Sequence, residues 1–227
     1  MCWVRPILGW LLFTGLWTFA SNAGEINGRV LITKTLTRKR VTLPSYQLRS
    51  TALPSRSDDA SPVSELDRLA IYLEGANLRA GTPVRVELDQ KNRRFKPEIL
   101  VIPLGSTVSF PNSDPIFHNV FSLSKARQFD LGYYPSGQTR TVRFERAGVV
   151  QVYCHLHPQM SAAILVVPSA WHTKPLKDGS FSLSEIPAGR YTAVAWHKSG
   201  GFFKREVEVA DSGSVALNFT IPIREQE

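Results

Sequence analysis

The stretch that decides the fold is Tyr153-Cys154-His155-Leu156-His157-Pro158-Gln159-Met160. A thiolate, an imidazole three residues later and a thioether three residues after that place three soft donors on one short loop. Two histidines, one thiolate and a weak axial methionine form the donor set of a mononuclear copper site. The second histidine must come from elsewhere in the chain, and His118 is the candidate. The stretch therefore predicts a metal site built from two distant segments.

The residues on both sides of this loop are typical of β-strands. Val149–Cys154 precedes the loop and Ala162–Val167 follows it. Because side chains alternate across a strand, Cys154 shares a face with Val150 and Val152 and points toward a core. Further strands are predicted at 28–33, 69–73, 99–103, 107–110, 118–123, 139–144, 180–183, 191–196, 202–209 and 215–221, with a loop around 132–137. No helical periodicity of useful length follows residue 23, so the fold class is predicted to be all-β.

The composition divides the chain into four parts. Residues 1–23 carry one basic residue and an apolar run too short for a membrane span, followed by small residues suited to cleavage. They are predicted to be a signal peptide, with an uncleaved anchor as the alternative. Residues 24–88 form an N-terminal β region with a disordered Ser-, Pro- and Asp-rich loop at 50–65. Residues 89–168 form one sandwich, and residues 176–223 form a second, smaller one.

Export changes the meaning of the cysteine. Exported proteins usually pair their cysteines as disulfides. Once the leader is removed, Cys154 is the only cysteine, so no internal disulfide can form. A lone thiol in an oxidising compartment is either buried and inert or occupied by a metal or partner.

The chain is basic, with a formal charge of +8, to which the leader contributes only Arg5. Basic residues cluster at Arg38–Arg40, and a second cluster comprises Lys91, Arg93, Arg94 and Lys96. These clusters predict docking to an acidic partner protein or to an anionic membrane surface. The alternative is a set of solvated strand faces. Nucleic acid is excluded as a partner, because an exported protein rarely meets it.

The segment Val101–Val167 resembles a cupredoxin, the type 1 blue-copper family of amicyanin and plastocyanin. His118-Asn119-Val120 matches the family's first-ligand motif, and Val108-Ser109-Phe110 matches the preceding strand. Cys154-x-x-His157-Pro158-x-Met160 has the short spacing of amicyanin. The resemblance implies a Greek-key β-sandwich that binds one copper. It implies equatorial ligation by His118, Cys154 and His157, and axial ligation by Met160.

Several neighbouring residues have predicted roles around this site. Asn119 is expected to tie the two ligand loops together. The edge of His157, with Leu156 and Pro158 around it, is the expected electron exit, and simple loop packing is the alternative for those two neighbours. His155 is expected to point away from Cys154, toward the surface or the outer shell of the site. The remaining histidines, His172 and His197, are treated as structural.

The C-terminal segment resembles a carboxypeptidase regulatory-like, transthyretin-like sandwich of the immunoglobulin type. The motifs are Asp178–Leu183 followed by Ile186–Tyr191, and Gly28-Arg29-Val30 is similar to the first strand of such modules. These modules are usually accessory and noncatalytic. We therefore expect the cupredoxin segment to be inserted into, or packed on, a sandwich that shares N- and C-terminal strands.

The leading functional hypothesis is a periplasmic type 1 copper protein that carries single electrons between redox partners and is not an enzyme. Five histidines are too few for a multicopper oxidase cluster, and the one cysteine that follows the leader is too few for a binuclear purple centre. One alternative is a copper delivery or storage protein that uses the same ligands. The other is a noncatalytic interaction module.

Overall fold

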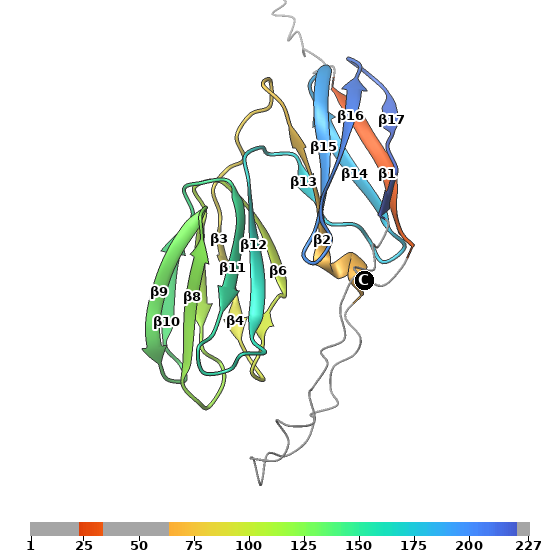
Figure 1. Ribbon diagram of the computed structural model, residues 1–227. Coiled ribbons are helices and arrows are strands. Elements are labelled where there is room, and N and C mark those ends of the chain that lie inside the picture. The colour runs from red at the N-terminus through yellow and green to blue at the C-terminus, as the bar shows by residue number, and fades with distance from the viewer. Residues whose placement is uncertain (1–22, 34–63, 222–227) are drawn as a thin grey trace, which may run out of the picture.

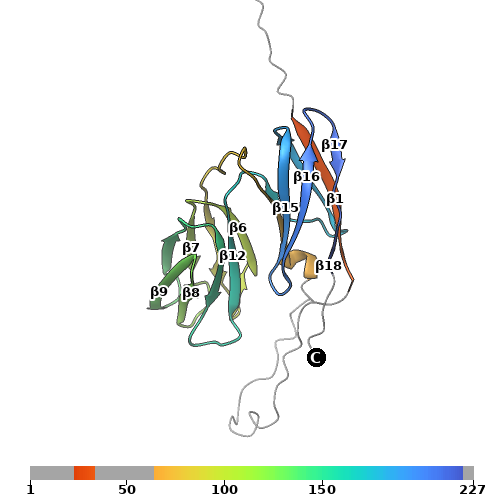
Figure 2. The same cartoon turned by 45° about the horizontal axis from the view of Figure 1, so that its top comes forward.

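The computed structural model describes residues 23–33 and 64–221. Within these ranges every element is a strand except the 3-10 helix η2 (Glu65–Arg68), which confirms the prediction of an all-β chain. None of the described segments forms a helix with the length and apolar character needed to cross a bilayer. The loop 50–65, the signal peptide 1–23 and the Arg38–Arg40 cluster fall wholly or largely outside the described residues. Figures 1 and 2 show two β-sandwiches lying side by side.

The first sandwich contains the ligand loop. Its larger sheet has the order β6-β12-β11-β8-β9, and its smaller sheet has the order β10-β7-β3. The larger sheet comprises β6 (Ile99–Pro103), β8 (His118–Ser124), β9 (Arg127–Tyr134), β11 (Gly148–Tyr153) and β12 (Ser161–Val167). The smaller sheet comprises β3 (Arg85–Glu87), β7 (Thr107–Pro111) and β10 (Thr139–Arg143), and a short hairpin joins β4 (Asp89–Gln90) to β5 (Phe95–Lys96). Apolar side chains from both sheets form one core, which includes Phe110, Val152, Cys154 and Met160.

The second sandwich is built from both ends of the described chain. Its strands are β1 (Gly24–Ile32), β2 (Leu69–Glu74), β13 (His172–Thr173), β14 (Ser180–Ile186), β15 (Gly189–His197), β16 (Gly201–Val209), β17 (Ser214–Ala216) and β18 (Phe219–Ile221). Strand β1 pairs with β14, β17 and β18, while β2 pairs with β13 and β15. Strands β1 and β2 of the segment 24–88 therefore complete a sandwich with strands from 172–221, as the hypothesis of shared strands requires, whereas β3 of that segment belongs to the first sandwich.

The two sandwiches pack against each other through one sheet of each. Strand β12 carries apolar side chains on both faces. One face contributes to the core of the first sandwich, and the other contributes to a separate apolar cluster between the two sandwiches. Leu165 and Ala163 of β12 meet Tyr72 of β2 and Trp196 of β15 in that cluster. A strand buried on both faces has a continuous apolar sequence rather than an alternating one. We call this contact the seam.

The prediction of a loop at 132–137 is wrong for its first part, because β9 continues to Tyr134. The pairing of β8 with β9 shifts register between Asn119 and Phe121, which is a β-bulge. Gly132 has a φ of +66°, a conformation that glycine adopts without strain. Beyond the bulge the pairing resumes as His118 with Tyr134. Gly132 therefore lies within β9, at the bulge, and does not end the strand.

Candidate metal centre

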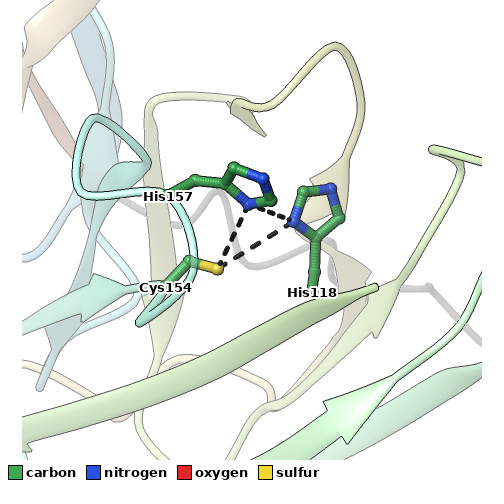
Figure 3. A group of neighbouring side chains, drawn as sticks. All are labelled: His118, Cys154 and His157. Atoms are coloured by element: carbon green, nitrogen blue, oxygen red, sulfur yellow. Dashed lines mark hydrogen bonds between the residues drawn. The ribbon is translucent and has the colours of Figure 1, made fainter. Parts of the chain in front are cut away.

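Three predicted donors converge at one end of the first sandwich. The Nδ1 atoms of His118 and His157 are 3.1 Å apart, and Cys154 Sγ is 3.9 Å from the first and 3.8 Å from the second. Figure 3 shows the two rings and the sulfur pointing toward one another. This is the one group of three potential metal-binding His, Cys or carboxylate side chains within the described ranges.

Sheet pairing explains why these residues meet. His118 is the first residue of β8, and Cys154 directly follows β11. These strands are neighbours in the same sheet, paired through Phe121 and Tyr153. The chain then turns through His157, and the N–H of Met160 closes the turn by donating to the His157 carbonyl at 2.8 Å. The turn returns the chain to β12 and leaves the His157 ring over Cys154.

The burial of the cluster suits soft donors. His118 and Cys154 are buried, and His157 is only partly so. Met160 is 1% exposed and belongs to the same core cluster as Cys154, so its thioether lies in the apolar surroundings of the thiol. Its role as the axial ligand stays a prediction. Burial among apolar residues limits access of solvent and oxidants to the sulfur.

Asn119 connects the two segments that carry the donors. Its backbone N–H donates to Cys154 Sγ at 3.5 Å, and its side-chain oxygen accepts from the His155 N–H at 3.4 Å. Its amide nitrogen donates to Asp130 Oδ1 at 2.7 Å and to the Gly132 carbonyl at 3.2 Å. A single buried amide therefore holds the Cys154 segment against the β8–β9 bulge, which is the position expected for this residue.

Asp114 is a residue that the sequence reading missed. Its Oδ2 lies 2.8 Å from Nε2 of His118, on the side of the ring opposite Cys154. Burial acts to raise the pKa of this carboxyl, but hydrogen bonds from the Arg93 N–H, His118 and the Asn92 N–H outweigh it, so the pKa lies below its ordinary value. The sequence feature that could have identified Asp114 is its position four residues before His118, a candidate ligand.

His157 is disposed to remain neutral. Burial, together with the nearby His118 and Arg93, lowers the pKa of its imidazole below the ordinary value, and Asp114 opposes this shift. Only the neutral form of histidine offers a lone pair to a metal. The electrostatic surroundings of His157 therefore favour the form that a metal site needs.

The other histidines lie apart from the donor cluster. The ring of His155 stacks on Phe121, with centroids 3.8 Å apart, and its Nε2 is 3.8 Å from Asp130 Oδ2. It is about half exposed, as expected for a side chain pointing away from Cys154. His172 and His197 belong to the second sandwich. His197 is fully buried, and its Nδ1 accepts from the N–H groups of Ser199 and Gly200.

The donor spacing fits one metal ion. Metal–nitrogen bonds of about 2.0 Å and metal–sulfur bonds of about 2.3 Å around one ion place neighbouring donor atoms roughly 3–4 Å apart. The three observed separations fall in this range. Two imidazoles, a thiolate and a nearby thioether are donors that copper prefers, because thiolate and thioether are soft and imidazole suits both of its oxidation states.

The chain has partial similarity to several solved copper proteins. It matches the Cu-containing nitrite reductase NirK from Thermus scotoductus SA-01 at 24% identity over 42% of this chain and 25% of that one, with a TM-score of 0.36. It matches a purple cupredoxin from Nitrosopumilus maritimus at 24% identity over 37% of this chain and 99% of that one, with a TM-score of 0.32.

It also matches the reduced Cu(I) form of an amicyanin mutant at 18% identity over 43% of this chain and 98% of that one, with a TM-score of 0.35. No family model matches the chain, and no curated protein matches it in sequence. The match spans a quarter of the nitrite reductase.

Proposed function

We propose that this protein is a mononuclear copper protein that carries single electrons between redox partners. The observation that supports this most directly is the convergence of two imidazole nitrogens on one buried thiol, at 3.1–3.9 Å. His118, Cys154 and His157 would hold the metal, with Met160 as the weak axial donor. Bound there, copper would supply the Cu(II)/Cu(I) couple.

The surrounding residues suit fast electron transfer, which requires little movement between oxidation states. His118 is fixed by Asp114, and the Cys154 segment is fixed by Asn119. The fourth predicted donor is packed in the core. Because these supports come from the folded chain, the donors would move little when a bound copper changes oxidation state. No described side chain is assigned to act on a substrate, and we propose no substrate chemistry.

The partner is proposed to be a protein with an acidic face. His157 is the least buried of the three donors. Leu156, which precedes it, is 46% exposed, and Phe117, which precedes His118, is 56% exposed. Beside them, Arg93, Arg94 and Lys96 line a hollow together with Asp114 and Ile116. An apolar contact area next to basic side chains suits an acidic partner, with charge steering the encounter. Binding to anionic vesicles in place of such a protein would favour the membrane alternative.

The protein is proposed to act outside the cytoplasm, in the periplasm or another exported location. The support is the leader-like segment 1–23 and the single remaining thiol, Cys154. A free thiol in an oxidising compartment is protected when a metal holds it as thiolate. Determination of the N-terminal residue of the exported protein tests this proposal.

The decisive experiment is a visible absorption spectrum of the protein from Gly24 to Glu227 after addition of Cu(II). We expect one copper per chain and an intense thiolate-to-copper band. Cys154→Ser should abolish the band, whereas His155→Gln should keep it, because His155 points away from the donors. Copper bound without the band would instead support delivery or storage, and the absence of stoichiometric binding would support an interaction module.

A further inference from the structure

The carboxylate of Asp114 faces one of the two ring nitrogens of His118. Oδ2 of Asp114 is 2.8 Å from Nε2 of His118, and both side chains are buried. An ionised carboxylate only accepts hydrogen bonds, so the nitrogen that faces it is the N–H. In the neutral ring the other nitrogen, Nδ1, then carries the lone pair. That nitrogen is the one that faces Cys154 Sγ and His157.

The same carboxylate is held in place by a backbone turn. Asp114 Oδ1 accepts from the Asn92 N–H at 2.5 Å, and Oδ2 accepts from the Arg93 N–H at 2.8 Å. Asn92 and Arg93 have φ values of +57° and +52° at the tip of the β4–β5 hairpin. In this conformation two successive N–H groups point to one side and form an anion-binding concavity. The Asp114 N–H also donates to Asn112 Oδ1 at 3.1 Å.

Asp114 therefore joins two features that are separate in the sequence. It contacts His118, a candidate copper ligand, and it accepts a hydrogen bond from the Arg93 N–H at the tip of the β4–β5 hairpin. The side chains of Arg93 and Arg94 from that hairpin line the hollow described above. The two oxygens of Asp114 accept the N–H groups of Asn92 and Arg93, and Oδ2 also faces the imidazole Nε2. Carboxylates placed behind ligand histidines fix the tautomer and raise the basicity of the ring.

We infer that Asp114 is a positioning residue that holds His118 as an Nδ1 donor, with the β4–β5 turn holding Asp114 in its place. The inference rests on the proposed metal site and names a determinant of its affinity and potential. A more basic His118 stabilises Cu(II) more than Cu(I). Removing the carboxylate therefore weakens Cu(II) binding and shifts the reduction potential upward.

The first test needs no substitution. Long-range ¹H–¹⁵N NMR of the imidazole rings in the metal-free protein distinguishes the two tautomers of His118. We expect the Nε2–H tautomer. Finding Nδ1–H as the main form of His118 would overturn the inference, and this result does not depend on whether copper gives a blue band.

The second test uses Asp114→Asn, which keeps the size of the side chain and removes its charge. We expect Cu(II) affinity to fall roughly 10- to 100-fold, the usual effect of removing such an outer partner. The reduction potential should rise, and the His118 tautomer should become mixed. Asp178→Asn is the matched control, because Asp178 is an exposed carboxylate in the second sandwich. An affinity and potential in Asp114→Asn equal to those of Asp178→Asn would overturn the inference.

The proposed function fails separately from this inference. If the unaltered protein gives no thiolate-to-copper band, the electron-carrier proposal is wrong, while the tautomer of His118 still decides the role of Asp114. If the band is present and the tautomer is Nδ1–H, the carrier proposal stands and the positioning role is wrong.

Discussion

Asn119 and Cys154, 35 residues apart in the chain, are joined by a hydrogen bond from the Asn119 N–H to the cysteine sulfur. The bond links β8 to the loop after β11, so the segment that presents His118 is tied directly to the segment that presents Cys154. The side chain of Asn119 reinforces the link by accepting from the His155 N–H. The two segments that carry the donors are thus connected directly by hydrogen bonds.

Asn119→Ala should destabilise the metal-free protein by about 1–3 kcal/mol, because it leaves buried hydrogen-bonding groups around the bulge without a partner. The side chain is 1% exposed and bonds to Asp130, Gly132 and His155. Thermal unfolding measures the change, and the copper spectrum reports whether the thiolate geometry loosens. Asn77→Ala, at an exposed position, should change stability by less than about 0.5 kcal/mol. Equal effects of the two substitutions would contradict a bridging role for Asn119.

Met160→Leu should alter the copper site with little effect on the fold. The two side chains have similar volumes, so the stability change should stay below about 1.5 kcal/mol. Loss of the thioether removes a weak donor that the more electron-poor Cu(II) needs more than Cu(I) does, and the reduction potential should rise. Protein-film voltammetry and the visible spectrum measure this.

The control for Met160 is Ile164→Val in the same core cluster. It should cost about 0.5–1.5 kcal/mol of stability and leave the potential unchanged. If Met160→Leu left both the potential and the spectrum unchanged, the thioether would not be a copper ligand, and Met160 would be only a core residue.

The sequence predicted the parts of the site that follow from local patterns. The alternation in Val149–Cys154 correctly placed Cys154 among apolar neighbours, and the order of strands and loops brought His118 near it. Asp114 was missed because its role depends on the N–H groups of Asn92 and Arg93, and the backbone geometry of a hairpin tip is not visible in residue types. The seam was missed because a run such as Ala162–Val167 looks the same whether its second face meets a sheet or a helix.

Neutralising Arg93 and Arg94 should weaken steering toward an acidic partner. In Arg93→Gln/Arg94→Gln the association rate should fall at low salt and become less sensitive to ionic strength, because exposed charges act through a screened field. The contact that holds Asp114 should persist, since the N–H of residue 93 still bonds to that carboxylate. Stopped-flow electron transfer with an acidic redox protein over a range of salt concentrations measures the rate.

The control for the charge is Arg143→Gln/Arg190→Gln, which removes the same charge from exposed positions on other strands. It should leave most of the salt dependence intact. If both double variants changed the rate equally, the effect would reflect total charge, and the hollow beside Asp114 would have no special part in docking.

Glu98 should make the seam sensitive to acid. It accepts from Arg68 and Lys198 of the second sandwich at 3.0 and 2.8 Å while lying beside β6 of the first. Burial acts to raise its pKa, but these two cations outweigh burial, and the pKa lies below its ordinary value. Because the folded pKa is lower than the unfolded one, the stabilisation is complete above the unfolded pKa of about 4.5 and is lost as pH falls through the folded pKa.

Glu98→Gln should therefore lower stability by about 1–3 kcal/mol near neutral pH, since hydrogen bonds to a charged group are replaced by weaker ones. The same substitution should flatten the fall in stability below about pH 4.5, because the titrating group is gone. Chemical unfolding from about pH 3 to about pH 7, followed by tryptophan fluorescence to which Trp196 in the seam contributes, measures both effects. Glu208→Gln, which breaks an exposed pair with Arg190, should reproduce neither. An unchanged acid slope in Glu98→Gln would mean that the seam is held by its apolar cluster alone, with the ion pairs contributing nothing measurable.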